Sequence, residues 1–249
     1  MNSTRQPLSY LRPLLQADLL ILLRNRRVVL VSVLLPLLLL FVSAQKSPPG
    51  HASSALVVLA ITLGLLSLSI IGYASGLARD RERGVFQRLR VTPAPTWTIM
   101  VSRLLVQIVV GLLIAIVVLT IGASIGHISL DARQYLYAVL VAMLACVVFL
   151  SIGQALVGLV KSAAMVHGLG TVLFVTLALS GLWGFAGTMG SGFQAYARWT
   201  PVGTVITVFQ GAVHEVAWTG YTTMSLLVCI AYIAVCLTLG IKWFSWEAR

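Results

Sequence analysis

One motif that enzymes use occurs in this chain of 249 residues. The segment Gly122-Ala123-Ser124-Ile125-Gly126 matches the pattern G-x-S-x-G, in which a serine is a nucleophile once a histidine lies beside it. Because Ser124 falls at the outer end of an apolar stretch rich in small residues, such a match is expected by chance. An intramembrane serine protease that uses Ser124 is the alternative of another class, and Ser124→Ala should then abolish its activity.

The residues needed to bind a nucleotide or a metal are missing from the sequence. A P-loop requires a glycine directly before its lysine, and none of the chain's lysines follows a glycine. There is no H-E-x-x-H motif, and the 6 acidic residues are scattered. We therefore expect a chain that is not itself an enzyme, holds no metal and binds no cofactor.

The composition is that of a membrane protein. Hydrophobic residues make up 59% of the chain and charged residues only 9%, whereas soluble domains carry about 25% charged residues. A single soluble domain is therefore excluded. An apolar stretch of roughly 20 residues crosses a bilayer as a helix. The predicted spans are residues 28–44, 54–78, 104–125, 135–160, 162–187 and 221–241.

Two segments outside these spans also have a predicted structure. Leucines recur at steps of three or four between Leu8 and Leu22, which predicts that residues 1–27 form an amphipathic helix on the membrane surface. Residues 188–220 are apolar but broken by glycines and by Pro201, which predicts re-entrant helices shielded by protein. The expected fold is all-α, a single membrane domain of residues 1–249 with six transmembrane helices.

The formal charge of +11 indicates how the chain is oriented. Such an excess in a soluble protein would suggest a nucleic-acid partner, but in a membrane protein basic residues collect in the cytoplasmic loops. With the N-terminus inside, 14 of the 17 basic residues lie on the cytoplasmic side. We therefore expect both termini to be cytoplasmic, and no nucleic acid to be bound.

The most informative segment is the cytoplasmic loop of residues 79–99. It contains the sequence Arg79-Asp80-Arg81-Glu82-Arg83-Gly84-Val85-Phe86-Gln87-Arg88-Leu89-Arg90-Val91-Thr92-Pro93. Val85, Phe86 and Leu89 lie on one face at helical spacing, and Pro93 disfavours further helix. The composition alone fits an ordinary solvated loop, but the order of the residues does not.

That order resembles the permease subunit of the type-2 ABC transporters, in which an acidic and basic run, E-R-G and L-x-V-T-P follow one another. The segments 15–26, with Pro36 in the first span, resemble the family's entry helix and first span. The segments 179–182 and 199–203 resemble its fifth span and broken outer segment. Two positions depart from the family pattern, because Val85 replaces a frequent threonine and Trp183 stands where proline is common.

The resemblance implies the permease of a bacterial ABC exporter in the plasma membrane. The loop would be the coupling helix, and a separate ATPase subunit would bind ATP and Mg²⁺. Val85, Phe86 and Leu89 would enter a groove of the ATPase, with Arg81, Glu82, Arg83 and Arg88 paired around its rim. The docking residues implied are Arg79, Asp80, Arg81, Glu82, Arg83, Gly84, Val85, Phe86, Arg88, Leu89, Thr92 and Pro93.

Partners and substrate follow from the same resemblance. Six spans make half of a pore, so a second copy or a sister permease is expected, with membrane lipids around both. Apolar spans and short outer loops favour export of an amphiphile such as a drug, natural product or lipid, as in multidrug resistance. Export of a polysaccharide or lipid-linked glycan is the alternative. The expected pathway residues, whose hydroxyls could instead bond their own helix, are Ser67, Ser69, Tyr73, Thr176, Ser180 and Trp183.

Overall fold

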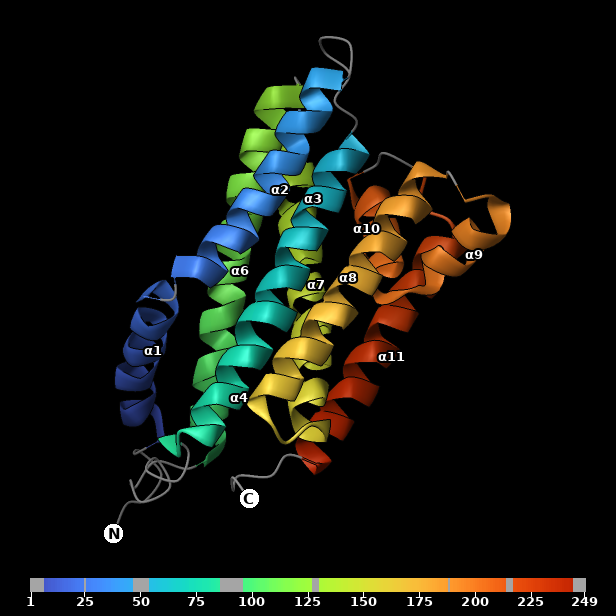
Figure 1. The fold of residues 1–249 in the computed structure, drawn as a ribbon. Coiled ribbons are helices and arrows are strands. Elements are labelled where there is room, and N and C mark those ends of the chain that lie inside the picture. Colours follow the sequence, from blue (N-terminus) through green and yellow to red (C-terminus); the bar gives the residue numbers. More distant parts are fainter. Residues whose placement is uncertain are drawn as a thin grey trace.

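The computed structural model describes residues 7–24, 26–46, 54–85, 96–126, 130–187, 189–213 and 217–243, and within these ranges it contains helices and no strands (Figure 1). In chain order the elements are α1 (Pro7–Arg24), α2 (Arg26–Lys46), α3 (Ser54–Ser67), η1 (Leu68–Ala74), α4 (Ser75–Glu82), α6 (Thr96–Gly126), α7 (Ala132–Leu159), α8 (Ala163–Ala186), α9 (Ser191–Trp199), α10 (Pro201–Ala212) and α11 (Gly220–Lys242).

Five helices of the described chain are long and apolar enough to cross a membrane, which makes this a multi-pass membrane protein. They cover Ser54–Glu82, Thr98–Gly126, Ala132–Leu159, Ala163–Gly184 and Gly220–Lys242. The first predicted span corresponds to α2, a helix of 21 residues whose described apolar part is the shorter stretch Leu30–Val42. Helix α2 packs lengthwise against α3 and α6.

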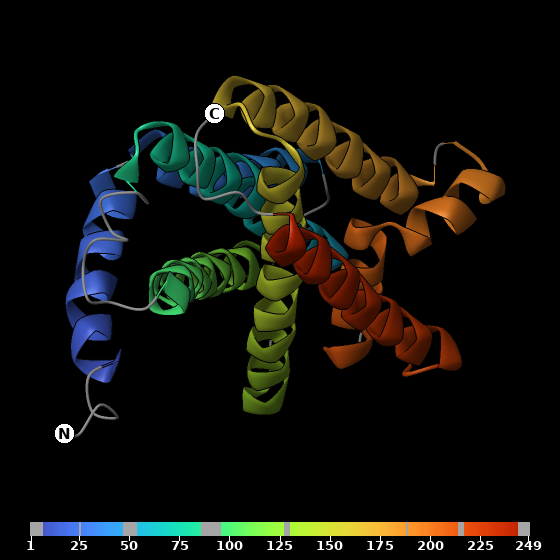
Figure 2. The same cartoon turned by 90° about the horizontal axis from the view of Figure 1, so that it is seen from below.

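The centre of the molecule is the continuous helix Ser54–Glu82, made of α3, η1 and α4. Of its apolar stretch 89% is buried, against 17% for α11. The side chains of Leu59, Leu65 and Leu66 are fully buried there, together with Phe149 of α7. Seen from below, α6, α7, α8 and α11 fan out around this centre (Figure 2). Because other helices surround the apolar stretch of this central helix, it has apolar side chains on every side and no polar face.

The middle of the central helix is a π-helix, which the hydropathy pattern did not predict. Along Leu68–Ala74 the backbone is wider than an α-helix. The Gln107 side-chain amide of α6 donates a hydrogen bond of 3.0 Å to the Leu68 carbonyl oxygen. A Cβ atom placed on Gly153 of α7 would lie 2.9 Å from the Ser69 carbonyl oxygen. Helices α6 and α7 therefore pack closely against backbone carbonyls of this segment.

Helices α7 and α11 cross at two glycines. A Cβ atom on Gly158 would lie 2.9 Å from the Gly240 carbonyl oxygen, and one on Gly240 would lie 2.8 Å from Cγ of Gln154. In membranes such small residues let helix backbones approach closely. The pair therefore fixes where α11 crosses α7.

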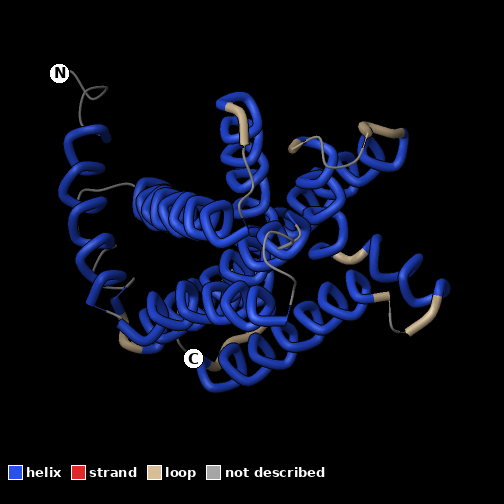
Figure 3. Tube along the Cα trace, turned by 90° about the horizontal axis from the view of Figure 1, so that it is seen from above, coloured by secondary structure: helices blue, strands red, loops and turns tan. Residues whose placement is uncertain are grey.

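The predicted re-entrant segment contains two helices. Thr200 caps α10 by accepting a hydrogen bond of 3.2 Å from the Gly203 amide, and Pro201 occupies the first turn. The α10 side chains Val202, Val205 and Phe209 are buried in the core. Helix α9 instead buries only Ala197. The segment thus forms one core helix and one surface helix at a single end of the bundle (Figures 1 and 3).

The opposite end of the bundle is the basic end. There the last turn of α4, the start of α6, the α7–α8 junction and the end of α11 lie together, at the bottom of Figure 1. Its described basic residues on these elements are Arg79, Arg81, Arg83, Arg103, Lys161 and Lys242.

Candidate functional site: the end of helix α4

Helix α4 ends at the basic end with a glycine in a left-handed conformation. The backbone amide of Arg83 donates to the Arg79 carbonyl (3.0 Å) and that of Gly84 to the Arg81 carbonyl (3.1 Å). Gly84 has φ +70°, which glycine adopts without the steric penalty that a Cβ atom brings. The chain therefore leaves the central helix sharply at the point where the predicted docking segment continues.

Arg81 binds the junction between α7 and α8. Its guanidinium donates hydrogen bonds to the backbone carbonyls of Val157 (2.9 Å), Val160 (2.6 Å) and Lys161 (2.6 Å). The carbonyls at the C-terminal end of a helix lack intrahelical partners and carry a partial negative charge. The buried Arg81 side chain, only 2% exposed, therefore closes the end of α7 with a full positive charge.

Glu82 binds the other side of the same junction. Its Oε1 accepts a hydrogen bond of 2.6 Å from the backbone amide of Ala163, the first residue of α8. Ser162, the residue at the N-cap position, makes no side-chain capping bond. A carboxylate at a helix N-terminus satisfies a free amide and is favoured by the helix dipole. Arg81 and Glu82 together, here named the α4 latch, bind the end of one helix and the start of the next.

Asp80 connects α4 to α6, on the side of α4 away from the α7–α8 junction. Its Oδ2 lies 2.7 Å from Nη1 of Arg103 on α6, and Arg103 also lies 3.7 Å from Asp18 of α1. The Ser102 hydroxyl donates a hydrogen bond of 2.6 Å to Asp18. Burial raises the pKa of Asp18, although the Ser102 hydrogen bond and the Arg103 charge act to lower it. The charged cluster joins three helices beside the α4 latch.

The docking residues predicted from the sequence fall into three groups. Asp80, Arg81 and Glu82 bond within the chain, so Arg81 differs from the expectation that it lies at the rim of a partner's groove. Arg79 and Arg83 are exposed, while Gly84 and Val85 are partly exposed. The remaining residues lie outside the described part of the chain: Phe86, Arg88, Leu89, Thr92 and Pro93.

The predicted pathway residues of the central helix point into the molecule. The Ser67 hydroxyl donates a hydrogen bond to the Gly64 carbonyl (2.9 Å) and lies 3.0 Å from the Ser32 hydroxyl. Ser69 is 1% exposed. The Tyr73 hydroxyl donates to Oε1 of Gln154 at 2.7 Å. These three side chains are thus used in packing the described helices against one another.

The predicted pathway residues of α8 lie in different surroundings. Thr176 is exposed, and its hydroxyl donates to the Val172 carbonyl at 2.9 Å. Trp183 is 36% exposed. Ser180 is buried and donates to the Leu177 carbonyl at 2.8 Å. Of the six predicted pathway residues, only Thr176 and Trp183 have exposed side chains in the described structure.

The serine of the G-x-S-x-G motif has no histidine beside it in the described chain. Ser124 is exposed and donates a hydrogen bond of 2.8 Å to the Thr120 carbonyl. His167 is the one histidine within the described ranges, and its Nδ1 lies 3.3 Å from the Ser75 hydroxyl on the central helix. The geometry of the described residues therefore gives the protease alternative no support.

Some residues of this site were not identified from the sequence. Asp18 and Arg103 are charges within otherwise apolar stretches, and that placement was a usable signal because unpaired charges are costly there. The carbonyls that bind Arg81 carry no such signal, since every residue has one.

One of two comparisons with known proteins gives a match. Comparison with curated proteins found none that matches the chain. The sequence model of the ABC-2 type transporter family matches residues 11–214, a range that contains the central helix, the α4 latch, the charged cluster and both α9 and α10. An ABC-2 permease works with an ABC ATPase. The chain therefore belongs to the ABC-2 type transporter family, as a membrane permease subunit.

Proposed function

We propose that this permease docks its ATPase at the basic end, through Arg79, Arg83 and the segment that follows Gly84, and that the α4 latch passes the movement to α8. The observation that carries the proposal is the bonding of Arg81 and Glu82 to the α7–α8 junction. ATP and Mg²⁺ would bind to the ATPase, and this chain would supply no nucleotide site.

The latch supports coupling because it joins the docking segment to two helices without an intervening loop. The two residues of the latch follow one another at the end of α4, so a shift of the docked segment displaces both together. Arg81 would pull on the end of α7 and Glu82 on the start of α8. Coupling of this kind requires an element with two arrangements, each favoured by a different state of the ATPase.

We also propose how the permease is oriented in the membrane and how it assembles. With α2 as a sixth span, the basic end and both termini are cytoplasmic, as the positive-inside rule favours. Helices α8 and α11 bury only 28% and 17% of their apolar stretches within the described chain. A second permease copy would cover part of this surface, and membrane lipids the rest.

The proposed substrate is an amphiphile exported from the cytoplasm or the inner leaflet. The exposed face of α8 supports it, because this face combines the apolar Val172 and Val175 with Thr176 and Trp183. Such a surface fits a molecule that is partly apolar and bears a few polar groups. Ser67, Ser69, Tyr73 and Ser180 would shape the helices behind this face.

Co-purification with the ATPase tests the proposal. We expect Phe86→Ala to leave the permease folded but to lower the amount of ATPase recovered and its hydrolysis rate, because a buried aromatic anchor contributes strongly to an interface. Phe41→Ala is the matched control, since Phe41 is 60% exposed on α2, away from the basic end. Equal recovery and equal hydrolysis with Phe86→Ala and Phe41→Ala would overturn the proposed docking site.

A further inference from the structure

Two hollows at the end of the bundle opposite the basic end meet at one arginine. The larger, about 520 Å³, lies between α9, α10 and α11, and the smaller, about 250 Å³, lies between α8, α9 and α10. Arg198, Thr207 and Gln210 line both. The larger hollow alone is within the range of about 300–1,000 Å³ that small-molecule sites occupy.

Four of the polar side chains that line these hollows have no partner within the described chain. The side chains of Arg198, Gln194, Gln210 and Ser225 make no hydrogen bond or ion pair to any described residue. Ser225 is 4% exposed and lines the larger hollow, whereas Gln194 and Gln210 are partly exposed and Arg198 is exposed. Because these polar side chains line the two hollows without a described protein partner, they are available to a ligand that enters there.

The positive charge that lines the hollows indicates which class of ligand they bind. Among the described residues, Arg198 is the only charged side chain that lines either of them. Its guanidinium presents a fork of N–H donors that matches the oxygens of a phosphate. The amides of Gln194 and Gln210 and the hydroxyl of Ser225 add further donors around it. A ligand with one negative charge and several acceptor oxygens therefore satisfies the lining groups.

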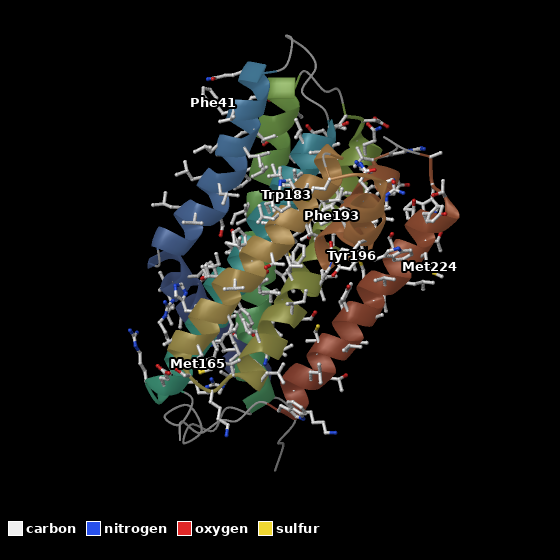
Figure 4. All side chains as sticks on the ribbon, turned by 45° about the vertical axis from the view of Figure 1, so that its right-hand side comes forward. Phe41, Met165, Trp183, Phe193, Tyr196 and Met224 are labelled. Carbon is white, nitrogen blue, oxygen red and sulfur yellow. The ribbon has the colours of Figure 1, made fainter. Side chains whose placement is uncertain are left out.

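The surroundings of the hollows favour a lipid as the source of that phosphate. Trp199 and Tyr221 line the larger hollow, and both are exposed. Trp183 contacts Phe193 edge to face, with ring centroids 6.5 Å apart. Figure 4 shows Tyr196 on α9 and Met224 on α11 at a similar level of the bundle. Tryptophan and tyrosine collect at the level of lipid headgroups, and exposed Met224 and Leu227 of α11 offer an apolar surface for acyl chains.

We infer that the hollows between α8 and α11 bind the phosphodiester headgroup of a membrane phospholipid, with Arg198 holding the phosphate. Gln194, Gln210 and Ser225 donate to its oxygens, and Trp199 and Tyr221 flank the glycerol. This inference goes beyond the proposed function and concerns the end of the molecule away from the ATPase.

Native mass spectrometry of the purified permease without its ATPase tests the inference. The probes are dioctanoyl-phosphatidylglycerol, dioctanoylglycerol, which lacks the phosphate, and inorganic phosphate. We expect Arg198→Gln to weaken phosphatidylglycerol binding about tenfold or more, as loss of a charged hydrogen bond does, and Ser225→Ala to weaken it less. Arg133→Gln is the matched control, because Arg133 is an exposed arginine near the start of α7 at the same end of the bundle.

Each possible result either supports or overturns a lipid headgroup site at Arg198. Selective weakening by Arg198→Gln, with dioctanoylglycerol bound poorly and inorganic phosphate failing to compete, supports a lipid headgroup site. Competition by inorganic phosphate at the lipid's own concentration would show a site for the free anion and overturn the lipid source. Equal binding by the Arg198→Gln and Arg133→Gln variants, or equal binding of dioctanoylglycerol, would overturn the role of Arg198. None of these results depends on whether an ATPase docks at the basic end.

Discussion

Arg81 on α4 and Lys161 at the α7–α8 junction are joined by a hydrogen bond of 2.6 Å between the guanidinium and the Lys161 backbone carbonyl. The 80 positions that separate them in sequence make this contact a link between the centre of the bundle and its periphery. Because the acceptor is a backbone atom, no substitution of the Lys161 side chain removes it. The arginine is therefore the side of the contact that mutation can test.

Replacing Arg81 is expected to destabilise the permease. Arg81→Gln leaves carbonyls of the α7 end without their buried partner, which costs about 2–4 kcal/mol. Arg79→Gln removes the same charge from an exposed position on the same helix and should change stability by less than about 0.5 kcal/mol. Thermal unfolding in detergent measures both. Similar melting temperatures for the two variants would show that the latch contributes little.

Asp18 is expected to make the docking of α1 depend on pH. Burial raises the pKa of Asp18 above its ordinary value of 3.8, so the protonated carboxyl favours the folded state. This stabilisation is complete below pH 3.8 and is lost as the pH rises through the raised pKa. We expect the melting temperature to fall as the pH rises from 3.8 through the raised pKa of Asp18. The Asp18→Asn variant should lack the part of this fall that Asp18 causes.

The control for the pH measurement is Asp131→Asn. Asp131 is exposed and caps α7, and asparagine also caps helices well. The Asp131→Asn variant should therefore keep the pH dependence of the wild type. A pH profile that Asp18→Asn leaves unchanged would contradict the assignment.

Gly240 is expected to tolerate no side chain where α11 crosses α7. In Gly240→Ala the new methyl group would meet Cγ of Gln154 at 2.8 Å and its backbone carbon at 3.0 Å, a clash that costs about 1–3 kcal/mol. Gly168→Ala on α8 is the matched control, because nothing lies within 4 Å of its added methyl group. Alanine there should be neutral or slightly stabilising. Equal unfolding temperatures for the two variants would refute the close crossing.

Hydropathy predicted the helical class of this fold well and the roles of individual residues less well. Apolar stretches such as residues 135–160 and 221–241 coincide closely with α7 and α11, because helices that cross a bilayer must be both long and apolar. The π-helix of Leu68–Ala74 could not be predicted in this way, since it depends on contacts with other helices, such as the hydrogen bond from Gln107 to the Leu68 carbonyl.

The candidate site was located from the sequence, but its bonding was not. The order of residues from Arg79 to Pro93 identified the loop after the second predicted span. Arg81 and Glu82 were expected at the rim of a partner's groove, and in the structure both bond to the α7–α8 junction. Alternating charges do not show which of them face inward, because that depends on which backbone groups the fold brings near.

Photo-crosslinking from position 86 tests the central claim that the ATPase docks beside the end of α4. A benzoylphenylalanine placed at Phe86, and separately at the control position Tyr221, is irradiated in the assembled transporter, and the adducts are identified by mass spectrometry. We predict that position 86 yields an adduct with the ATPase and that position 221 yields none. An intact complex in which position 86 gives no ATPase adduct, or in which position 221 gives one, would contradict the account.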